Sequence, residues 1–434
     1  MYQYKLYKYL IIILFSCSLH GMAQEKPLSL SLALEKALEN NYGIIISKSD
    51  TEIASINNNW GQAGKYPTIG FNASSANSYN VNDAADYSMN RLSSGLSMQW
   101  TVFSGFKVKF TKNKLEQLEE LAKGSSSVVV ENTIDDVIMA YYQVLLQKEK
   151  LSVLEIVMKL SNDRYNYEQK RLDLAVSFSY NVLQAKNLYL NDKALYMNQE
   201  VIFRNSIRNL NFLMALPPEE EWIFTEKFEP QMENYSYDDL LSKLLDNNSL
   251  LKNQYLGLLL KQTELKLNKS EFYPKVNLST GMDNTLSNTN RTGMDPTNSN
   301  SFNSYGNLSL SYNLYTGGSR KRAMEISKIN EEVAQIEIDE MKHILTNQLI
   351  NTLDYYDVRK LLFEVAEESM EAADLNLKIA DDKLKTGAIN SFNYRDIQMI
   401  YLNTAIRRLE SIYNLIDSRT ALTKLTGGLL LIDN

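Results

Sequence analysis

The residue types that most often carry out covalent or metal chemistry are scarce in this chain. It has one cysteine, Cys17, and two histidines, of which His20 lies beside Cys17 near the N-terminus. His343 is the only histidine in the rest of the sequence. The chain therefore offers no disulfide framework, no Cys/His metal site, and no Cys–His or Ser–His–Asp catalytic set. We predict that it is not an enzyme and has no cofactor and no metal.

Carboxylates are the remaining candidates for chemistry, since a glycoside hydrolase can work with two of them. No clustered Asp/Glu pair in a cleft-forming context stands out. The chain carries 45 Lys and Arg against 52 Asp and Glu, a net charge of −7. A net acidic chain is a poor nucleic-acid binder, because phosphate contacts need clustered cations. We expect no nucleic-acid partner.

The first 23 residues have the pattern of a secretory signal peptide. Lys5 and Lys8 supply positive charge, Leu10–Leu19 is apolar, and Gly21–Ala23 forms a small-residue cleavage site. An apolar run of about 10 residues is too short to span a bilayer, which needs about 20. We therefore expect an exported protein, and any membrane insertion must use strands.

Cys17 has a second possible meaning. The segment Leu14–Cys17 loosely resembles a lipobox, in which the cysteine becomes a lipid attachment site. Phe15 stands where a small residue is usual. The preferred interpretation is a small apolar residue within the signal peptide.

The chain contains an internal duplication with an offset of ~210 residues, far longer than the 20–50 residues of solenoid repeats. The matching phrases are Leu38–Asn41 and Leu245–Asn248, Tyr66-Pro67 and Tyr273-Pro274, and Phe103–Gly105 and Tyr315–Gly317. We divide the chain into a signal peptide (1–23), a first repeat (24–216), a connector (217–237) and a second repeat (238–434).

Proline placement predicts two helical hairpins, because proline inside a helix costs about 3 kcal/mol or more. No proline falls between Pro67 and Pro217, and none follows Pro296. The predicted hairpins cover about 105–215 and 317–427, with a first arm of roughly 100 Å in each. They break around 174–177 and at 386–391, where Gly387 suits a left-handed cap and Ser391 an N-cap.

Each repeat also predicts a pair of strands, at about 66–103 and about 274–315, with apolar and small polar residues in alternation. The alternating apolar residues are Leu96, Met98, Trp100 and Val102 in the first repeat, and Leu308, Leu310, Tyr312 and Leu314 in the second. Such a pattern fits a strand between lipid and water. The polar segments 77–91 and 285–303 are predicted to be the hairpin loops. Aromatic residues near the strand ends resemble an interfacial girdle: Tyr66, Phe71, Trp100, Phe103, Tyr273, Tyr312 and Tyr315.

Four strands cannot close a barrel, and open sheet edges cannot lie in hydrocarbon. Strands must therefore be pooled between copies of the chain. Two copies would give eight strands, whose side chains fill the interior, whereas three would give twelve, with room for water. The homotrimer is the better inference. A soluble sandwich sheet is the alternative, but the polar faces carry almost no charge.

In the order and spacing of these features the chain resembles the TolC-like outer-membrane efflux protein family. The resemblance rests on the opening helix Leu32–Asn41, the Tyr-Pro strand starts, the strand-to-helix junctions, the segment Gly387–Tyr394 and the closing Leu422–Gly427. It implies an α+β membrane protein, a trimer with a shared 12-strand transmembrane barrel and a long coiled-coil tunnel in the periplasm. It also implies docking at the helix tips to a periplasmic adaptor and an inner-membrane pump.

The resemblance points to residues of a gate at the periplasmic tips. Asn181 and Asn393 stand where family members often have aspartate, and Asp173 and Asp396 are the nearby carboxylates. Leu174 stands where the first tip often has glycine. A ring of acids would make a cation-selective throat, which the two asparagines weaken. Ser177, Gly387 and Ser391 complete the predicted gate.

The preferred interpretation is a passive exit duct in the outer membrane, belonging to a tripartite efflux or type I secretion system. Its cargo could be small molecules, metal ions or polypeptides. The alternative is a periplasmic coiled-coil scaffold or adaptor without a pore. That alternative would explain the helices but not the four alternating strands.

Overall fold

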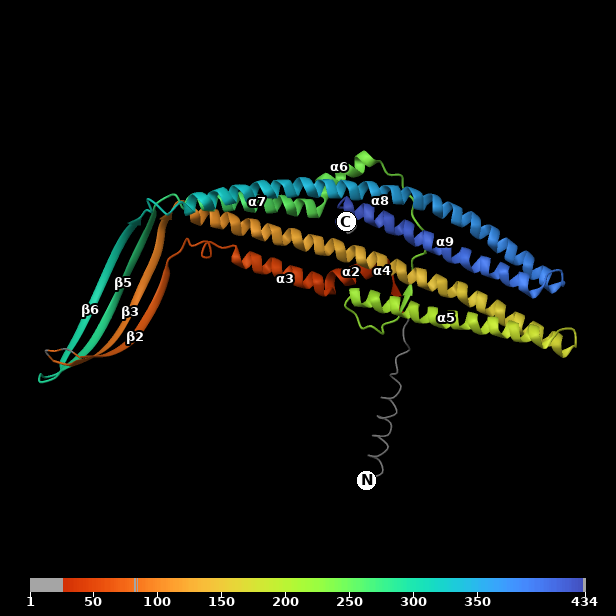
Figure 1. Cartoon of the computed structure of the whole chain (residues 1–434), viewed down its shortest axis with the longest axis horizontal. Coiled ribbons are helices and arrows are strands. Elements are labelled where there is room, and N and C mark those ends of the chain that lie inside the picture. Colours follow the sequence, from red (N-terminus) through yellow and green to blue (C-terminus); the bar gives the residue numbers. More distant parts are fainter. Residues whose placement is uncertain (1–25, 82, 84, 432–434) are drawn as a thin grey trace, which may run out of the picture. The chain divides into compact units, whose positions relative to one another are not determined.

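The computed structural model describes residues 26–81, 83 and 85–431 of the chain (Figure 1). The helices and strands are β1 (Lys26–Leu28), α2 (Leu30–Asn40), α3 (Tyr42–Asn57), β2 (Thr68–Asn80), β3 (Tyr87–Ser104), α4 (Lys107–Asp173), α5 (Ser179–Leu213), β4 (Trp222–Phe224), α6 (Tyr237–Asn247), α7 (Ser249–Ser270), β5 (Lys275–Arg291), β6 (Thr297–Ser311), α8 (Ser319–Lys385), α9 (Ser391–Leu425) and the 3-10 turn η1 (Leu429–Leu431). The predicted signal peptide and Cys17 lie outside the described residues.

The chain forms two compact units, and each draws on both sequence repeats. The helical unit comprises Met1–Ile45, Val129–Asn248 and Leu345–Asn434. The sheet unit comprises Ile46–Val128 and Ser249–Ile344. The duplication is visible in the helix lengths, since α4 and α8 have 67 residues each and α5 and α9 have 35 each. The long uninterrupted helices and their return helices are thus confirmed.

In the sheet unit, strands β2, β3, β5 and β6 form one antiparallel sheet in that order (Figure 1). β2 and β6 are its edges. The predicted loops 77–91 and 285–303 were wrong in extent, because most of their residues belong to strands that run on to Asn80 and Arg291. Their Asn, Ser and Thr residues continue the alternation rather than ending it.

The alternation holds along all four strands, with two local corrections. The apolar face carries Ile69, Phe71, Leu92, Leu96, Met98, Trp100, Val276, Leu278, Met282, Leu286, Phe302, Leu308 and Leu310. The polar face carries mainly Gly, Ser, Thr and Asn. A register shift between Thr101 and Phe103 places Phe103, not Val102, opposite Val276. Tyr312 and Leu314 lie beyond the strand, because β6 ends at Ser311.

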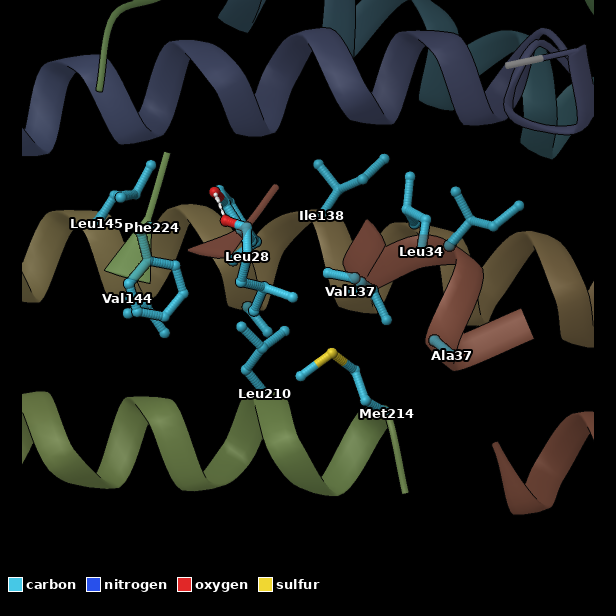
Figure 2. Packing of buried hydrophobic residues seen from close by; sticks show 14 of the residues in the cluster. Leu28, Leu34, Ala37, Val137, Ile138, Val144, Leu145, Leu210, Met214 and Phe224 are labelled. Atoms are coloured by element: carbon cyan, nitrogen blue, oxygen red, sulfur yellow. Dashed lines mark hydrogen bonds between the residues drawn. The ribbon is translucent and has the colours of Figure 1, made fainter. Parts of the chain in front are cut away.

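The helical unit has its main apolar core where the connector and the segment that follows the predicted signal peptide meet α4 and α5. Strand β1 pairs in parallel with β4, a pairing that the sequence of the connector did not predict. Figure 2 shows Leu28 and Phe224 from these strands packed with Val144 of α4 and Leu210 of α5. The hydroxyl of Tyr141 donates to the Leu28 carbonyl oxygen at 2.9 Å and thereby fixes β1 to α4.

The duplicated Asn-Asn sequence has the same structural role in both repeats. Asn41 ends α2, and its side-chain amide nitrogen donates to the carbonyl oxygen of Leu213, at the end of α5, at 2.8 Å. Asn248 ends α6, and its side-chain amide nitrogen donates to the carbonyl oxygen of Leu425, at the end of α9, at 3.0 Å. Each asparagine thus breaks one helix and satisfies a carbonyl that the end of a second helix leaves open.

Candidate functional site

The candidate site consists of the two turns that join the arms of the helical hairpins, both in the helical unit. The first tip is 174–178, between α4 and α5, and the second tip is 386–390, between α8 and α9. In the second tip Gly387 has φ +76°, and the Ala388 amide donates to the Lys383 carbonyl at 2.8 Å. In the first tip Ala175 has φ +58°, and the Val176 amide donates to the Arg171 carbonyl at 2.9 Å. Both are the glycine-type helix ending known as a Schellman motif.

In the first tip, Ala175 therefore occupies the position with positive φ that glycine occupies in the second tip. The expectation that Leu174 takes the glycine position was wrong. We expect Ala175→Gly to stabilise the first tip by about 1 kcal/mol, because glycine adopts positive φ without steric cost. Gly387→Ala should destabilise the second tip by a similar amount, through backbone strain alone, because a Cβ there would meet nothing within 4 Å. Hydrogen exchange of peptides covering each tip measures both effects. Shifts of the same sign in the two variants would contradict this prediction.

Glu168 on α4 connects the two tips. Its side chain is only 3 % exposed and accepts hydrogen bonds from the hydroxyls of Ser177 at 2.8 Å and Ser391 at 2.9 Å. Arg171, one turn further along α4, lies 3.5 Å from the same carboxylate. Ser391 is free to make this bond because the N-cap of α9 is Asn390, whose side chain accepts from the Asn393 amide. The prediction that Ser391 is the cap was wrong, since either polar residue could have filled that position.

A second bridge joins the hairpins deeper in the unit. Arg395 of α9 donates to both carboxylate oxygens of Asp192 on α5, at 2.6 and 2.7 Å. Ser161 of α4 also donates to Asp192. The Asp192 side chain is 1 % exposed and that of Arg395 is 15 % exposed, so the pair is shielded from water. Bidentate Arg–carboxylate pairs are directional, and this one fixes α9 against α5.

The surroundings of this bridge contain polar groups that are unusual for a helix interface. Arg164 is 5 % exposed, its Nε has no hydrogen-bond partner, and burial lowers the pKa of its guanidinium. Tyr394 is 2 % exposed, and burial together with the neighbouring Asp381 raises the pKa of its hydroxyl to about 12. The hydroxyl therefore stays protonated at neutral pH. These polar contacts adjoin an apolar cluster that includes Leu154, Val157 and Leu377 as well as Tyr394 itself.

The other predicted gate residues lie at the surface of the tips. Asp173 is the last residue of α4 and is exposed, as are Asn393 and Asp396 in the first turns of α9. The side chain of Asn181 donates to the Ser177 hydroxyl at 3.2 Å, and Ser177 in turn donates to the Glu168 carboxylate. The structure therefore brings Ser177, Asn181 and Ser391 together and leaves the two aspartates in solvent.

Most of the predicted aromatic girdle lies at the end of the sheet nearest the helices. The Trp100 indole donates to the Lys65 carbonyl at 2.9 Å, just before Tyr66. The ring centre of Phe106 lies 5.6 Å from that of Phe103 and 6.3 Å from that of Tyr273. Tyr312 and Tyr315 follow β6 and are exposed, and Phe71 lies further along β2, opposite Leu96.

The described residues hold no metal-type cluster, that is, no group of three or more His, Cys, Asp or Glu side chains placed to bind an ion. None of the described helices combines the length and the apolar character that crossing a membrane requires.

Comparison with known proteins identifies the family. Residues 33–214 and 240–428 match the family described as "Outer membrane efflux protein", one match for each sequence repeat. The chain belongs to the outer membrane efflux protein family. This family consists of export proteins of the outer membrane rather than enzymes, and this chain is an exit duct of that membrane.

Solved structures of outer-membrane channels share the fold at low sequence identity. The CmeC outer membrane channel of Campylobacter jejuni aligns over 92 % of this chain and 85 % of its own, with a TM-score of 0.76 and 14 % identity. VceC of Vibrio cholerae aligns over 92 % and 96 %, with a TM-score of 0.72 and 14 % identity. The open state of MtrE of Neisseria gonorrhoeae aligns over 92 % and 89 %, with a TM-score of 0.70 and 16 % identity. No curated protein sequence matches the chain.

Sequence reasoning missed Glu168, Asp192 and Arg395, although a signal for two of them was present. Leu154, Val157, Ser161, Arg164 and Glu168 follow one another at steps of three and four, so the buried face of α4 changes from apolar to polar toward the tip. Ala185, Asp192 and Gln199 repeat every seven residues on α5, and all are buried. A charged residue at a seam position of a coiled coil needs a partner.

Proposed function

We propose that this outer membrane efflux protein works as a homotrimer whose strands form one 12-strand barrel. The observation that carries the proposal is a four-stranded sheet with one apolar and one polar face and two open edges, β2 and β6. Edge strands present unpaired N–H and C=O groups, which hydrocarbon does not tolerate. Pairing β6 of one copy with β2 of the next satisfies these groups and closes the barrel around the polar faces.

The helical unit then extends into the periplasm and receives partners at its tips. The first tip exposes Leu174, Val176 and Phe178 by 74 %, 59 % and 79 %, and the second tip is followed by Phe392, which is 63 % exposed. Exposed apolar side chains concentrated in this way mark a protein–protein contact. The partner is a periplasmic adaptor that connects the duct to an inner-membrane pump, in a tripartite efflux or type I secretion system.

The transport itself is passive, and the tips act as its gate. In the closed state Glu168, Ser177 and Ser391 and the Asp192–Arg395 pair hold the two hairpins together. Asn181 and Asn393 leave the tips with less negative charge than aspartates would give, and Asp173 and Asp396 supply the carboxylates at their surface. Opening requires the hairpins to separate, a transition that partner contacts favour.

Single-particle imaging of the protein extracted from outer membranes in mild detergent tests the proposal. We expect hollow particles with three-fold symmetry. Solid or monomeric rods would overturn the duct and favour the coiled-coil scaffold. Planar-bilayer recordings of the same sample provide the functional readout, because a closed gate predicts low conductance that rises when the bridges at the tips are broken.

A further inference from the structure

The register of the sheet aligns four asparagines, one from each strand, in a single row. Asn77 of β2 pairs with Asn90 of β3, Asn90 pairs with Asn288 of β5, and Asn288 pairs with Asn298 of β6. The Asn288 amide nitrogen donates to the Asn298 amide oxygen at 2.7 Å. By the alternation of each strand, all four residues belong to the apolar face. We call them the asparagine row.

The asparagine row lies where the apolar face ends, toward the hairpin turns. Along β6, Asn298 is twelve positions from Leu310, which lies at the helix-side end of the strand. At ~3.4 Å per residue and a strand tilt of ~45°, this separation is ~29 Å along the membrane normal. The apolar band of an outer-membrane barrel is ~25 Å tall. The row therefore falls just beyond the hydrocarbon, at the level of the lipid head groups on the outer side.

The chemistry of the row favours the hydroxyl groups of a partner over any phosphate that the partner carries. Each amide can both donate and accept hydrogen bonds. None of the described strand residues on the apolar face is charged, and Arg91 belongs to the opposite face. Phosphate recognition would use Arg or Lys. Together with Ser75 and Asn300, the row borders a hollow of about 460 Å³, most of whose lining residues belong to the apolar face, with Arg91 of the opposite face also contributing to the lining.

We propose that the asparagine row binds the sugar head groups of glycolipid in the outer leaflet. The inference rests on the proposed function, because the face must turn outward on a closed barrel. Three copies of the chain would continue the row around the whole circumference. Hydrogen bonds from this belt set the depth of the barrel in the membrane, while the apolar residues below it contact the acyl chains.

Native mass spectrometry of the full-length trimer tests the proposal, with two probes: a glycolipid made of lipid A and core sugars, and phosphatidylglycerol. The test variant replaces the row (N77A/N90A/N288A/N298A). The matched control replaces four asparagines of the polar face (N72A/N277A/N303A/N307A). A double variant, N288V/N298V, serves if the fourfold change prevents folding, because valine suits a strand and makes no side-chain hydrogen bond.

We expect the row variants to lose about tenfold or more in glycolipid affinity, since each lost hydrogen bond contributes ~0.5–1.5 kcal/mol and 1.4 kcal/mol is tenfold. Phosphatidylglycerol binding should be unchanged, and the polar-face control should bind glycolipid as the wild type does. Equal glycolipid binding by row and control variants would overturn the proposal, as would wild-type binding of phosphatidylglycerol alone. Absence of three-fold hollow particles in the wild type would instead overturn the proposed function.

Discussion

Replacing Arg395 with glutamine should release the two hairpins from each other near the tips. The change leaves Asp192, which is 1 % exposed, without its bidentate partner. Breaking a buried ion pair in this way costs about 3–5 kcal/mol. Amide exchange in α5 around Asp192 and in the first turns of α9 should therefore accelerate by about 100-fold or more. Mass-spectrometric hydrogen exchange of the purified full-length protein measures this acceleration directly.

Two further variants show whether the charge pair itself is responsible. Asp396→Asn changes an exposed residue next to Arg395 and should leave exchange as in the wild type. The double variant D192L/R395M removes both charges, and we expect it to regain much of the lost protection, because two apolar side chains can replace a buried pair. If R395Q and D396N exchange alike, the bridge does not hold the hairpins. Under the proposed function, R395Q should also raise the conductance of single channels.

The local patterns in the sequence were sufficient for the elements but not for the contacts between them. Proline-free segments and steps of three and four residues depend only on chain-local physics, and they predicted α4, α5, α8 and α9. The meeting of Arg395 with Asp192 depends on how far one hairpin is shifted along the other. Nothing within either helix determines that shift, so the pair could not be predicted from spacing.

In the sheet, the sequence failed for a different reason, because strand residues were assigned to loops. The segments 77–91 and 285–303 were assigned to loops because Asn, Ser and Thr usually mark turns. In this protein the same residues occur in strands that run on to Asn80 and Arg291. The composition of a loop and that of a polar strand end are alike. The pairing of Asn90 with Asn288, which the structure supplies, distinguishes them.

Replacing Gly105 with alanine should prevent correct folding of the first strand-to-helix junction, whereas the equivalent change at Gly317 should be mild. Both glycines have positive φ, +64° and +61°. A Cβ at Gly105 would lie 2.5 Å from the Ser270 carbonyl oxygen and 2.6 Å from the Tyr273 Cβ, but one at Gly317 would meet nothing within 4 Å. Gly317→Ala therefore costs only backbone strain, about 1 kcal/mol. Gly105→Ala adds a backbone clash, and we expect about 4 kcal/mol or more.

The yield of folded protein from outer membranes and its thermal unfolding measure this difference between matched positions of the two repeats. Similar, small losses for both variants would mean that the first junction can relax, and would contradict the prediction. The next residue shows why relaxation is unfavourable. Phe106 has φ +66°, where the second repeat has Gly318, and its ring packs edge-on against Phe103 and Tyr273. Moving the chain to accommodate a methyl group at Gly105 would separate these rings. The first junction therefore has ring packing at the position where the second junction has a flexible glycine, and that packing prevents the backbone from relaxing.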